Sequence, residues 1–174
     1  MKLPDKLPEK LEVLVITLSD RAHSGEYEDK SGPKVKEMLS SYLYSISWDH
    51  RIDSTLLPDE STKLKDLVEK SSSIYDLIIT TGGTGIGPRD ITVDTISPLL
   101  SKQIPGIMEF IRVRYGMEKP NALLSRGVAG IAGKSIIYTL PGSVAAVGEY
   151  MTEILKTLKH TFYMMYGIDS HAKP

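Results

Sequence analysis

Residues 76–90 read DLIITTGGTGIGPRD: a short apolar run, a loop that carries four glycines, and then Arg89-Asp90. The apolar run is typical of a strand that is buried on both faces of a parallel sheet. Glycines let the backbone turn sharply and bring N–H groups close to an anion, and the start of a following helix adds partial positive charge. The stretch therefore predicts a buried strand, a loop that holds phosphate or carboxylate, and a helix.

Two known phosphate motifs fail on this loop. A P-loop needs Lys and then Ser or Thr after its last glycine, but Pro88 and Arg89 follow Gly87. The dinucleotide motif G-x-G-x-x-G puts Pro88 at its third glycine. The loop is therefore neither of these motifs, and a tight turn without a ligand stays the alternative.

Outward from this loop, apolar strand patterns alternate with helical ones. Strands are expected over Glu12–Leu18, more weakly over Ile46–Leu57, and over Ser135–Leu140. Helices are expected over residues 31–43, after Asp59, from Thr92 with a break at Pro98, around Ile107–Ile111, and over Val144–Tyr166. Ser31 is expected to cap the first helix, and Asp59 or Ser61 the second.

This order predicts an α/β fold with three layers, in which a mostly parallel sheet carries helices on both faces. We expect one domain over residues 11–168, between flexible tails at residues 1–10 and 169–174. Loops Ser19–Lys30, Gly82–Thr92 and Pro141–Ser143 follow the carboxyl ends of strands. Because ligands bind at those ends in such sheets, the three loops are expected to converge on one site.

The composition excludes several classes of function. The 174 residues are 41% hydrophobic and 25% charged, with a net charge of −1, as in an ordinary globular domain without the basic excess of a nucleic-acid binder. There is no cysteine, so disulfides, thiolate metal sites and a cysteine nucleophile are excluded. The start resembles no signal peptide, and no apolar run reaches a membrane span. We therefore expect a cytoplasmic protein with no membrane or nucleic-acid partner.

Arg89, Asp90 and Asp59 are the charged candidates. An arginine beside a phosphate loop can clamp phosphate oxygens. An aspartate there repels phosphate unless a cation lies between them, and Mg²⁺ typically binds one or two carboxylates together with substrate phosphates. Asp59 follows Pro58 at the end of a strand, and topology places it near Asp90. In the alternative interpretation, Asp90 and Asp59 only cap helices.

Six blocks in the same order resemble the MogA/MoaB family of molybdopterin-processing proteins, which includes the gephyrin G domain. They are VLVITLSDRAHSGEYEDKSGP, LLPDE, DLIITTGGTGIGPRDIT, IPGIMEFIR, ALLSRGVAGIAGK and SIIYTLPGS, spread over residues 11–166. The resemblance implies an adenylyltransferase that uses ATP and Mg²⁺ to couple AMP to the molybdopterin phosphate with release of pyrophosphate. It also implies a homotrimer, or a hexamer, that works with other molybdenum-cofactor biosynthesis proteins.

The resemblance also implies roles for particular residues. Asp59 and Asp90 match the two family carboxylates and are expected to bind the metal and orient the triphosphate. The expected nucleotide-binding residues are Thr81, Gly82, Gly83, Thr84, Gly85, Arg89, Pro141, Gly142 and Ser143. The expected molybdopterin-binding residues are Ser19, Asp20, Ser24, Asp29 and Ser125.

Two positions depart from the family pattern. Val93 stands where many members have Pro, and Ala132 where many have a basic residue that could favour the anionic pterin. Both departures favour the MoaB-like branch and keep a second function open, a molybdopterin-binding protein without turnover. A third alternative is a nucleotide hydrolase that needs no pterin, against which the missing P-loop lysine counts.

Overall fold

The predicted alternation of strands and helices is present in the computed structural model, which describes residues 6–168. In chain order the elements are β1 (Lys10–Leu18), α1 (Asp20–His23), α2 (Ser31–Ser45), β2 (Asp49–Leu57), α3 (Ser61–Ser71), β3 (Leu77–Thr81), α4 (Thr92–Ile96), η1 (Ser97–Leu99), β4 (Lys102–Gln103), α5 (Pro105–Gly116), η2 (Pro120–Leu124), β5 (Ala129–Ala132), β6 (Ser135–Leu140) and α6 (Val144–Tyr166). The elements η1 and η2 are 3₁₀ turns.

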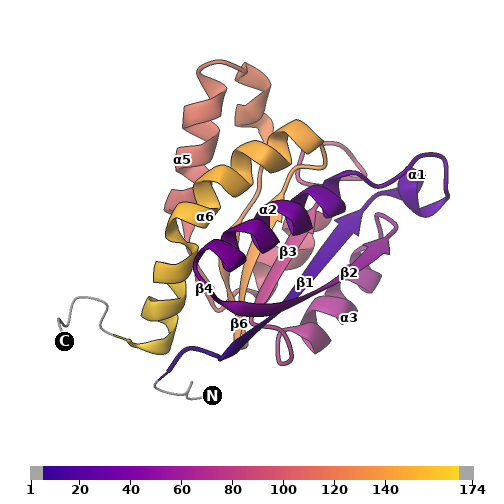
Figure 1. Cartoon of the computed structure of the whole chain (residues 1–174). Helices are drawn as coiled ribbons and strands as arrows, with labels where there is room; N and C mark the ends of the chain where they lie inside the picture. The colour runs from indigo at the N-terminus through magenta and orange to yellow at the C-terminus, as the bar shows by residue number, and fades with distance from the viewer. Residues whose placement is uncertain (1–5, 169–174) are drawn as a thin grey trace.

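The strands form one sheet in the order β2-β1-β3-β6-β5-β4. The first four strands are parallel, whereas β5 runs antiparallel to β6 and β4 antiparallel to β5. Parallel neighbours require crossover connections, and helices supply them here. The carboxyl ends of β1, β2, β3 and β6 therefore lie at the same edge of the sheet (Figure 1).

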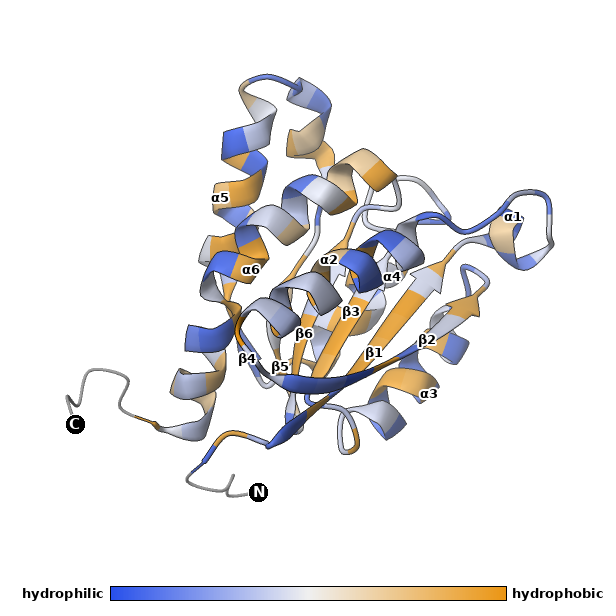
Figure 2. Cartoon of the chain, in the orientation of Figure 1, coloured by the Kyte–Doolittle hydropathy of each residue, from blue (hydrophilic) through white to orange (hydrophobic). Residues whose placement is uncertain are grey.

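Helices cover both faces of the sheet and enclose two separate cores. Helices α2, α5 and α6 pack on one face, and α3 and α4 on the other. Val13 and Val15 of β1 point into the first core, and Leu14 and Ile16 into the second, because successive side chains of a strand alternate between faces. This burial on both sides explains the continuous apolar strands in Figure 2 and confirms the prediction of a three-layer α/β fold.

Packing against the core begins before residue 11, where the domain was expected to start. Leu7 packs against the first core, and the Trp48 indole Nε1 donates to the carbonyl of Pro8 at 2.9 Å. Residues 1–5 and 169–174 of the two expected tails lie outside the described residues.

The expected strand over residues 46–57 starts only at Asp49, so the prediction was wrong for its first three residues. Ile46 instead ends α2, and its N–H donates to Tyr42 O at 3.2 Å. Ser47 then takes a left-handed conformation with φ of 54°, which turns the chain into β2. The alternation of Ile46 and Trp48 therefore comes from a helix end and a turn.

The helix starts also differ from prediction. Ser31 is the first residue of α2, and the Asp29 carboxylate accepts from the backbone N–H of Ser31 at 3.0 Å and of Gly32 at 3.1 Å. Neither Asp59 nor Ser61 caps α3, since Glu60 precedes that helix and makes no side-chain cap. The break expected at Pro98 is confirmed, because α4 ends at Ile96 and η1 follows.

Sequence analysis predicted neither β4 nor β5. Each has four residues or fewer, which is too short for a periodic pattern, and they add an antiparallel edge to the sheet. Across residues 6–168, no helix has the length and apolar character needed to cross a membrane.

Candidate active site

The register of the sheet brings the expected loops together. Leu18 of β1 lies beside Leu57 of β2, Thr17 lies beside Thr81 of β3, and Thr81 lies beside Leu140 of β6. The loops that follow these strands therefore start side by side. Their convergence at the carboxyl edge of the sheet, which the strand order predicted, is confirmed.

The glycine loop begins in a conformation that only glycine adopts easily. Gly82 has φ of 100°, and a Cβ there would lie 2.2 Å from the backbone oxygen of Leu18. Gly83 has φ of 65°, and its Cβ would lie 2.4 Å from Thr92 Oγ1. Positive φ and this close approach of backbone from β1 and side chain from α4 explain the paired glycines.

All four carbonyls of residues 82–85 accept hydrogen bonds from the protein. The Thr92 hydroxyl donates to Gly82 O at 2.7 Å, and the Thr92 N–H donates to Gly83 O at 3.0 Å. The Arg126 backbone N–H donates to Thr84 O at 2.8 Å, and its side-chain Nε donates to Gly85 O at 2.7 Å. Because a trans peptide points its N–H opposite to its carbonyl, the loop presents donors on its other side. Such amides form an anion-binding surface.

The carboxylates of Asp20 and Asp59 each accept a hydrogen bond from the other residue's backbone N–H. The Asp20 N–H donates to Asp59 Oδ2 at 3.1 Å, and the Asp59 N–H donates to Asp20 Oδ1 at 2.9 Å. Arg89 Nε donates to Asp20 Oδ2 at 2.9 Å. Hydrogen bonding from the Asp59 backbone and from Arg89 lowers the pKa of Asp20, whereas burial raises the pKa of Asp59. The loops after β1, β2 and β3 thus place the ion pair of Asp20 and Arg89 beside the half-buried carboxylate of Asp59.

Asp90 belongs to the glycine loop and does not cap α4. Ile91 precedes that helix without a side-chain cap, so the alternative interpretation of Asp90 as a helix cap was wrong. Instead, Asp90 Oδ2 accepts from the Gly87 N–H at 2.8 Å. A Cβ on Gly85 would lie 2.8 Å from the same oxygen. The small size of Gly85 therefore lets the carboxylate lie directly against the loop.

Two adjoining cavities open at this edge of the sheet. One, the carboxylate pocket, has a volume of about 490 Å³ and is lined by Ser19, Asp20, Asp59 and Arg89 among others. The other, the tyrosine pocket, has a volume of about 380 Å³ and is lined by Lys119, Asn121, Ser125, Pro141, Glu149 and Tyr150 among others. Both are lined by Gly83, Asp90, Gly142 and Ser143. The site therefore has two chambers that meet at the glycine loop and the start of α6.

Most of the residues selected from the sequence line one of these pockets, but three do not. Ser24 is exposed, and its hydroxyl donates to Arg21 O at 3.0 Å. Thr81 is fully buried and donates to the carbonyl of Pro141 at 3.0 Å, which ties β3 to the loop after β6. Asp29 lies in the loop before α2, outside both linings.

Asp29 lines a third cavity, of about 410 Å³, together with Gly142 and Ser143, and it also holds the framework of the site. Besides capping α2, its carboxylate accepts from the Thr17 hydroxyl of β1 at 2.7 Å. A Cβ on Gly32 would lie 2.5 Å from that hydroxyl and 2.6 Å from the Asp29 carboxylate. Asp29 and Gly32 thus let the start of α2 approach β1 closely.

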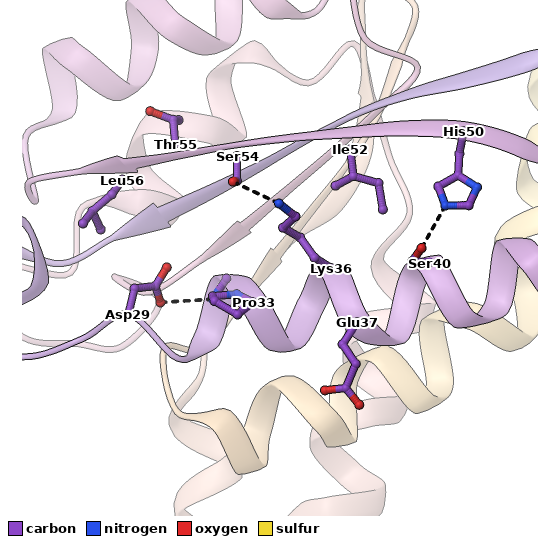
Figure 3. A pocket seen from close by; sticks show the side chains of 11 residues that line it. Asp29, Pro33, Lys36, Glu37, Ser40, His50, Ile52, Ser54, Thr55 and Leu56 are labelled. Atoms are coloured by element: carbon purple, nitrogen blue, oxygen red, sulfur yellow. Dashed lines mark hydrogen bonds between the residues drawn. The ribbon is translucent and has the colours of Figure 1, made fainter.

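A cavity of about 760 Å³ lies elsewhere, between α2 and β2 (Figure 3). Hydrogen bonds join its two walls, from Lys36 Nζ to Ser54 Oγ at 3.4 Å and between Ser40 Oγ and His50 Nε2 at 2.9 Å. Asp29 is the residue of the predicted site that lines it. Since these polar side chains bind one another, this cavity is a weaker ligand site than the two chambers at the glycine loop.

From the sequence, no role in the site was assigned to Thr92, Arg126 or Tyr150. Thr92 and Arg126 hold the loop from outside, and Tyr150 lies in the wall of the tyrosine pocket. Burial raises the pKa of Tyr150, and within the described chain the Tyr150 hydroxyl finds no hydrogen-bond partner. A tyrosine on the otherwise apolar face of the last helix was the available signal for it.

Known proteins share this fold. A family model described as a probable molybdopterin binding domain matches residues 14–160. The molybdopterin adenylyltransferase of Helicobacter pylori (strain J99) is 36% identical over 159 residues, which cover 88% of this chain and 86% of that protein. Gephyrin of Dictyostelium discoideum is 35% identical over 162 residues, which cover 89% of this chain but only 22% of gephyrin. The solved structure of the tungsten cofactor synthesizing protein MoaB from Pyrococcus furiosus matches with a TM-score of 0.79 and 34% identity, covering 92% of this chain and 99% of that chain.

Proposed function

Since the chain belongs to the family of probable molybdopterin binding domains, we propose that it transfers AMP from ATP to the phosphate of molybdopterin and releases pyrophosphate. The observation that carries this proposal is the pair of chambers that meet at Gly83, Asp90, Gly142 and Ser143. A reaction between two phosphorylated substrates needs two ring-binding sites whose phosphates meet. The meeting point here presents backbone N–H groups and the start of a long helix.

The residues present fit a magnesium ion. Asp59 and Asp90 each use one carboxylate oxygen to accept a backbone hydrogen bond, and within the described chain the other oxygen has no donor. No group of three or more His, Cys, Asp or Glu residues suited to a metal is found among residues 6–168. Two carboxylates completed by substrate phosphates are a usual way to hold Mg²⁺. When bound, Mg²⁺ supplies positive charge that offsets the charge of the triphosphate.

The proposed chemistry is an in-line displacement at phosphorus. An oxygen of the molybdopterin phosphate attacks the α-phosphorus of ATP, the bond from that phosphorus to the bridging oxygen breaks, and pyrophosphate leaves with that electron pair. Such chemistry depends on positioning and charge neutralisation, so no protein nucleophile is required. The glycine-loop amides bind phosphate oxygens, and Asp59 and Asp90 orient the triphosphate. Arg89, now paired with Asp20, lies at the rim of the carboxylate pocket.

The pterin contacts expected from the sequence remain proposals: Ser19, Asp20, Ser24, Asp29 and Ser125. Ser19 and Asp20 line the carboxylate pocket, and Ser125 lines the tyrosine pocket. Among the nucleotide contacts, Ser143 has a second task, because its side chain caps α6 by accepting from the Ala146 N–H at 3.2 Å.

The two departures from the family pattern lie away from the chambers. Ala132 is buried in β5 opposite Ser135, the first residue of β6, whereas the site lies beyond Leu140 at the other end of that strand. Val93 is buried in α4 and lines neither pocket. Neither residue removes charge from the site, so catalysis is favoured over a binding protein without turnover.

The experiment is chromatographic detection of adenylylated molybdopterin after incubation of the protein with ATP, Mg²⁺ and molybdopterin. Asp59→Asn and Asp90→Asn are expected to lower kcat by about 100-fold or more, by analogy with the loss of a single charge-stabilising group in other enzymes. Asp53→Asn is the control, because Asp53 pairs with Arg51 on the same strand β2, accepts from the Tyr75 hydroxyl, and lines neither chamber.

Each alternative function has its own result. Pterin binding without product identifies a non-catalytic binding protein, and ATP hydrolysis without pterin identifies a hydrolase. Retained activity in both aspartate variants contradicts the carboxylate assignment, even if the wild type makes product.

We further propose that residues 11–168 form one domain and that the protein assembles as a homotrimer, or a hexamer, in the cytoplasm. Phe110 and Val113 of α5, Met117 directly after it, and Leu123 and Leu124 of η2 are each more than half exposed. Clustered exposed apolar side chains mark association surfaces. Phe110→Glu is expected to reduce the mass seen by light scattering, whereas Ile74→Glu, at an exposed residue after α3, should leave it unchanged. An unaltered mass for Phe110→Glu contradicts the use of this surface.

A further inference from the structure

Arg126 binds the glycine loop at three points. Its backbone N–H donates to Thr84 O at 2.8 Å, its Nε donates to Gly85 O at 2.7 Å, and its Nη2 donates to Asp90 O at 3.0 Å. The first two carbonyls belong to the anion-binding part of the loop, and the third belongs to a candidate metal ligand. One residue therefore holds both parts of the site in a fixed relation.

Asp94 fixes the plane of this guanidinium. Arg126 Nη1 donates to Asp94 Oδ1 at 2.8 Å, and Nη2 donates to Oδ2 at 3.0 Å. Paired, parallel bonds of this kind set orientation as well as attraction. Asp94 lies in the first turn of α4, so the guanidinium is anchored to a regular element. The arrangement uses Nε, Nη1 and Nη2, which lysine cannot reproduce.

The bonds from Arg126 decide which way the loop amides point. With the carbonyls of Thr84 and Gly85 turned toward Arg126, the N–H groups of Gly85 and Ile86 point away from it. Glycine-rich backbone has little intrinsic preference and would otherwise sample other orientations. The carbonyl bond at Asp90 similarly sets the position from which its side chain extends.

Arg126 makes its hydrogen bonds to the site through these backbone groups, and its positive charge also interacts with Asp90. It is absent from the linings of both the carboxylate and the tyrosine pockets, and it lies with Asp94 along a separate cleft on the outer side of the loop. We propose that Arg126 is a positioning residue for adenylyl transfer, which orients the phosphate-binding amides and Asp90 without touching substrate. This inference rests on the proposed function.

The test compares Arg126→Met with Arg114→Met. Arg114 is the matched control, because its Nε pairs with Glu153 Oε1 at 3.1 Å on α5 and α6, outside both pocket linings. Three quantities are measured: ATP affinity without Mg²⁺ by calorimetry, the Mg²⁺ concentration for half-maximal product formation, and amide hydrogen exchange of residues 83–91 in the ligand-free protein. Melting temperature reports whether each variant folds.

For Arg126→Met we expect ATP affinity to fall about tenfold, the half-activating Mg²⁺ concentration to rise severalfold and loop exchange to accelerate, since small misplacements of catalytic groups cost large factors in rate. Arg126→Lys and Asp94→Asn should give smaller changes in the same direction, and Arg114→Met none. A lower melting temperature with unchanged ATP affinity would show that Arg126 only stabilises the fold and would overturn the proposal.

Amide hydrogen exchange of residues 83–91 tests this inference separately from the proposed function. Unchanged exchange in Arg126→Met overturns the positioning role whatever the wild type does. Absence of ATP binding and product in the wild type overturns the proposed function, and the role of Arg126 in adenylyl transfer with it.

Discussion

Replacing Gly82 by alanine should both destabilise the protein and disturb the glycine loop. Gly82 follows the last residue of β3, and its N–H donates to Leu140 O at 2.9 Å, so it is held between neighbouring strands. Its φ of 100° lies in the region that L-residues rarely adopt. The new Cβ would also lie 2.2 Å from the Leu18 backbone oxygen, far inside van der Waals contact.

Two costs add at this position. A non-glycine residue held at such a φ costs about 1–3 kcal/mol. Relieving the contact with Leu18 O requires β1 and β3 to move apart, and overpacking of this kind typically costs about 1–3 kcal/mol more. We therefore expect Gly82→Ala to lower the free energy of unfolding by about 2–6 kcal/mol, a large part of the roughly 5–15 kcal/mol that stabilises a typical domain.

Urea denaturation measures this loss, and two other glycines separate its causes. Gly25 has φ of 82°, but a Cβ added there would meet no heavy atom within 4 Å, so Gly25→Ala isolates the backbone cost at about 1–3 kcal/mol. Gly148 lies in α6 with open space around its Cβ position, so Gly148→Ala should stabilise by about 0.5–1 kcal/mol. If Gly82→Ala costs no more than Gly25→Ala, the close approach to Leu18 does not constrain the site.

Three further predictions concern single side chains. Thr92→Val, which removes the 2.7 Å bond to Gly82 O, should cost about 1–3 kcal/mol in urea denaturation and weaken ATP binding; unchanged values for both contradict the role of Thr92 in holding the loop. Asp29→Ala should cost about 2–4 kcal/mol in urea denaturation, because one carboxylate caps α2 and accepts from Thr17, and an unchanged free energy of unfolding contradicts this role. Burial raises the pKa of Tyr138 to about 12, so the folded state loses up to about 2.7 kcal/mol as the pH rises from 10 to 12, where the unfolded chain ionises first. Tyr138→Phe should lack that part of the alkaline destabilisation, and an identical pH profile in both proteins would show that Tyr138 does not contribute.

Burial also changes how Asp59 should behave with pH. Burial raises its pKa, and the nearby carboxylates of Asp20 and Asp90 raise it further, while Arg89 opposes them. A carboxylate whose pKa is raised by folding favours the folded state least when it is ionised, so Asp59 costs stability above its ordinary titration range. That cost is what a bound cation would offset, which is consistent with a site that binds metal together with substrate.

Local patterns in the sequence were sufficient for the fold class. Continuous apolar runs at Glu12–Leu18, Asp76–Thr81 and Ser135–Leu140 indicate strands buried on both faces, and helical periodicity between them indicates crossovers. Because such connections are nearly always right-handed and parallel strands end at one edge, the meeting of the loops followed from these patterns. The paired glycines Gly82 and Gly83 indicated a backbone that an anion can approach.

Tertiary structure alone decided which residues hold the loops of that site and how the site is divided into two chambers. Arg126 meets Gly85 across 41 residues and Asp20 meets Asp59 across 39, contacts that depend on the order of strands in the sheet and leave no periodic trace in the chain. The short antiparallel edge formed by β4 and β5 was likewise not predictable from the sequence, because strands of so few residues show no periodic pattern. The sequence thus determined which residues can face a phosphate, because strand ends and glycine conformations are local properties. Only folding decided that Asp20 supports Asp59, that Asp29 binds Thr17 of β1 and that Arg126 supports the loop, because hydrogen bonds between distant residues form only once the sheet has brought them together.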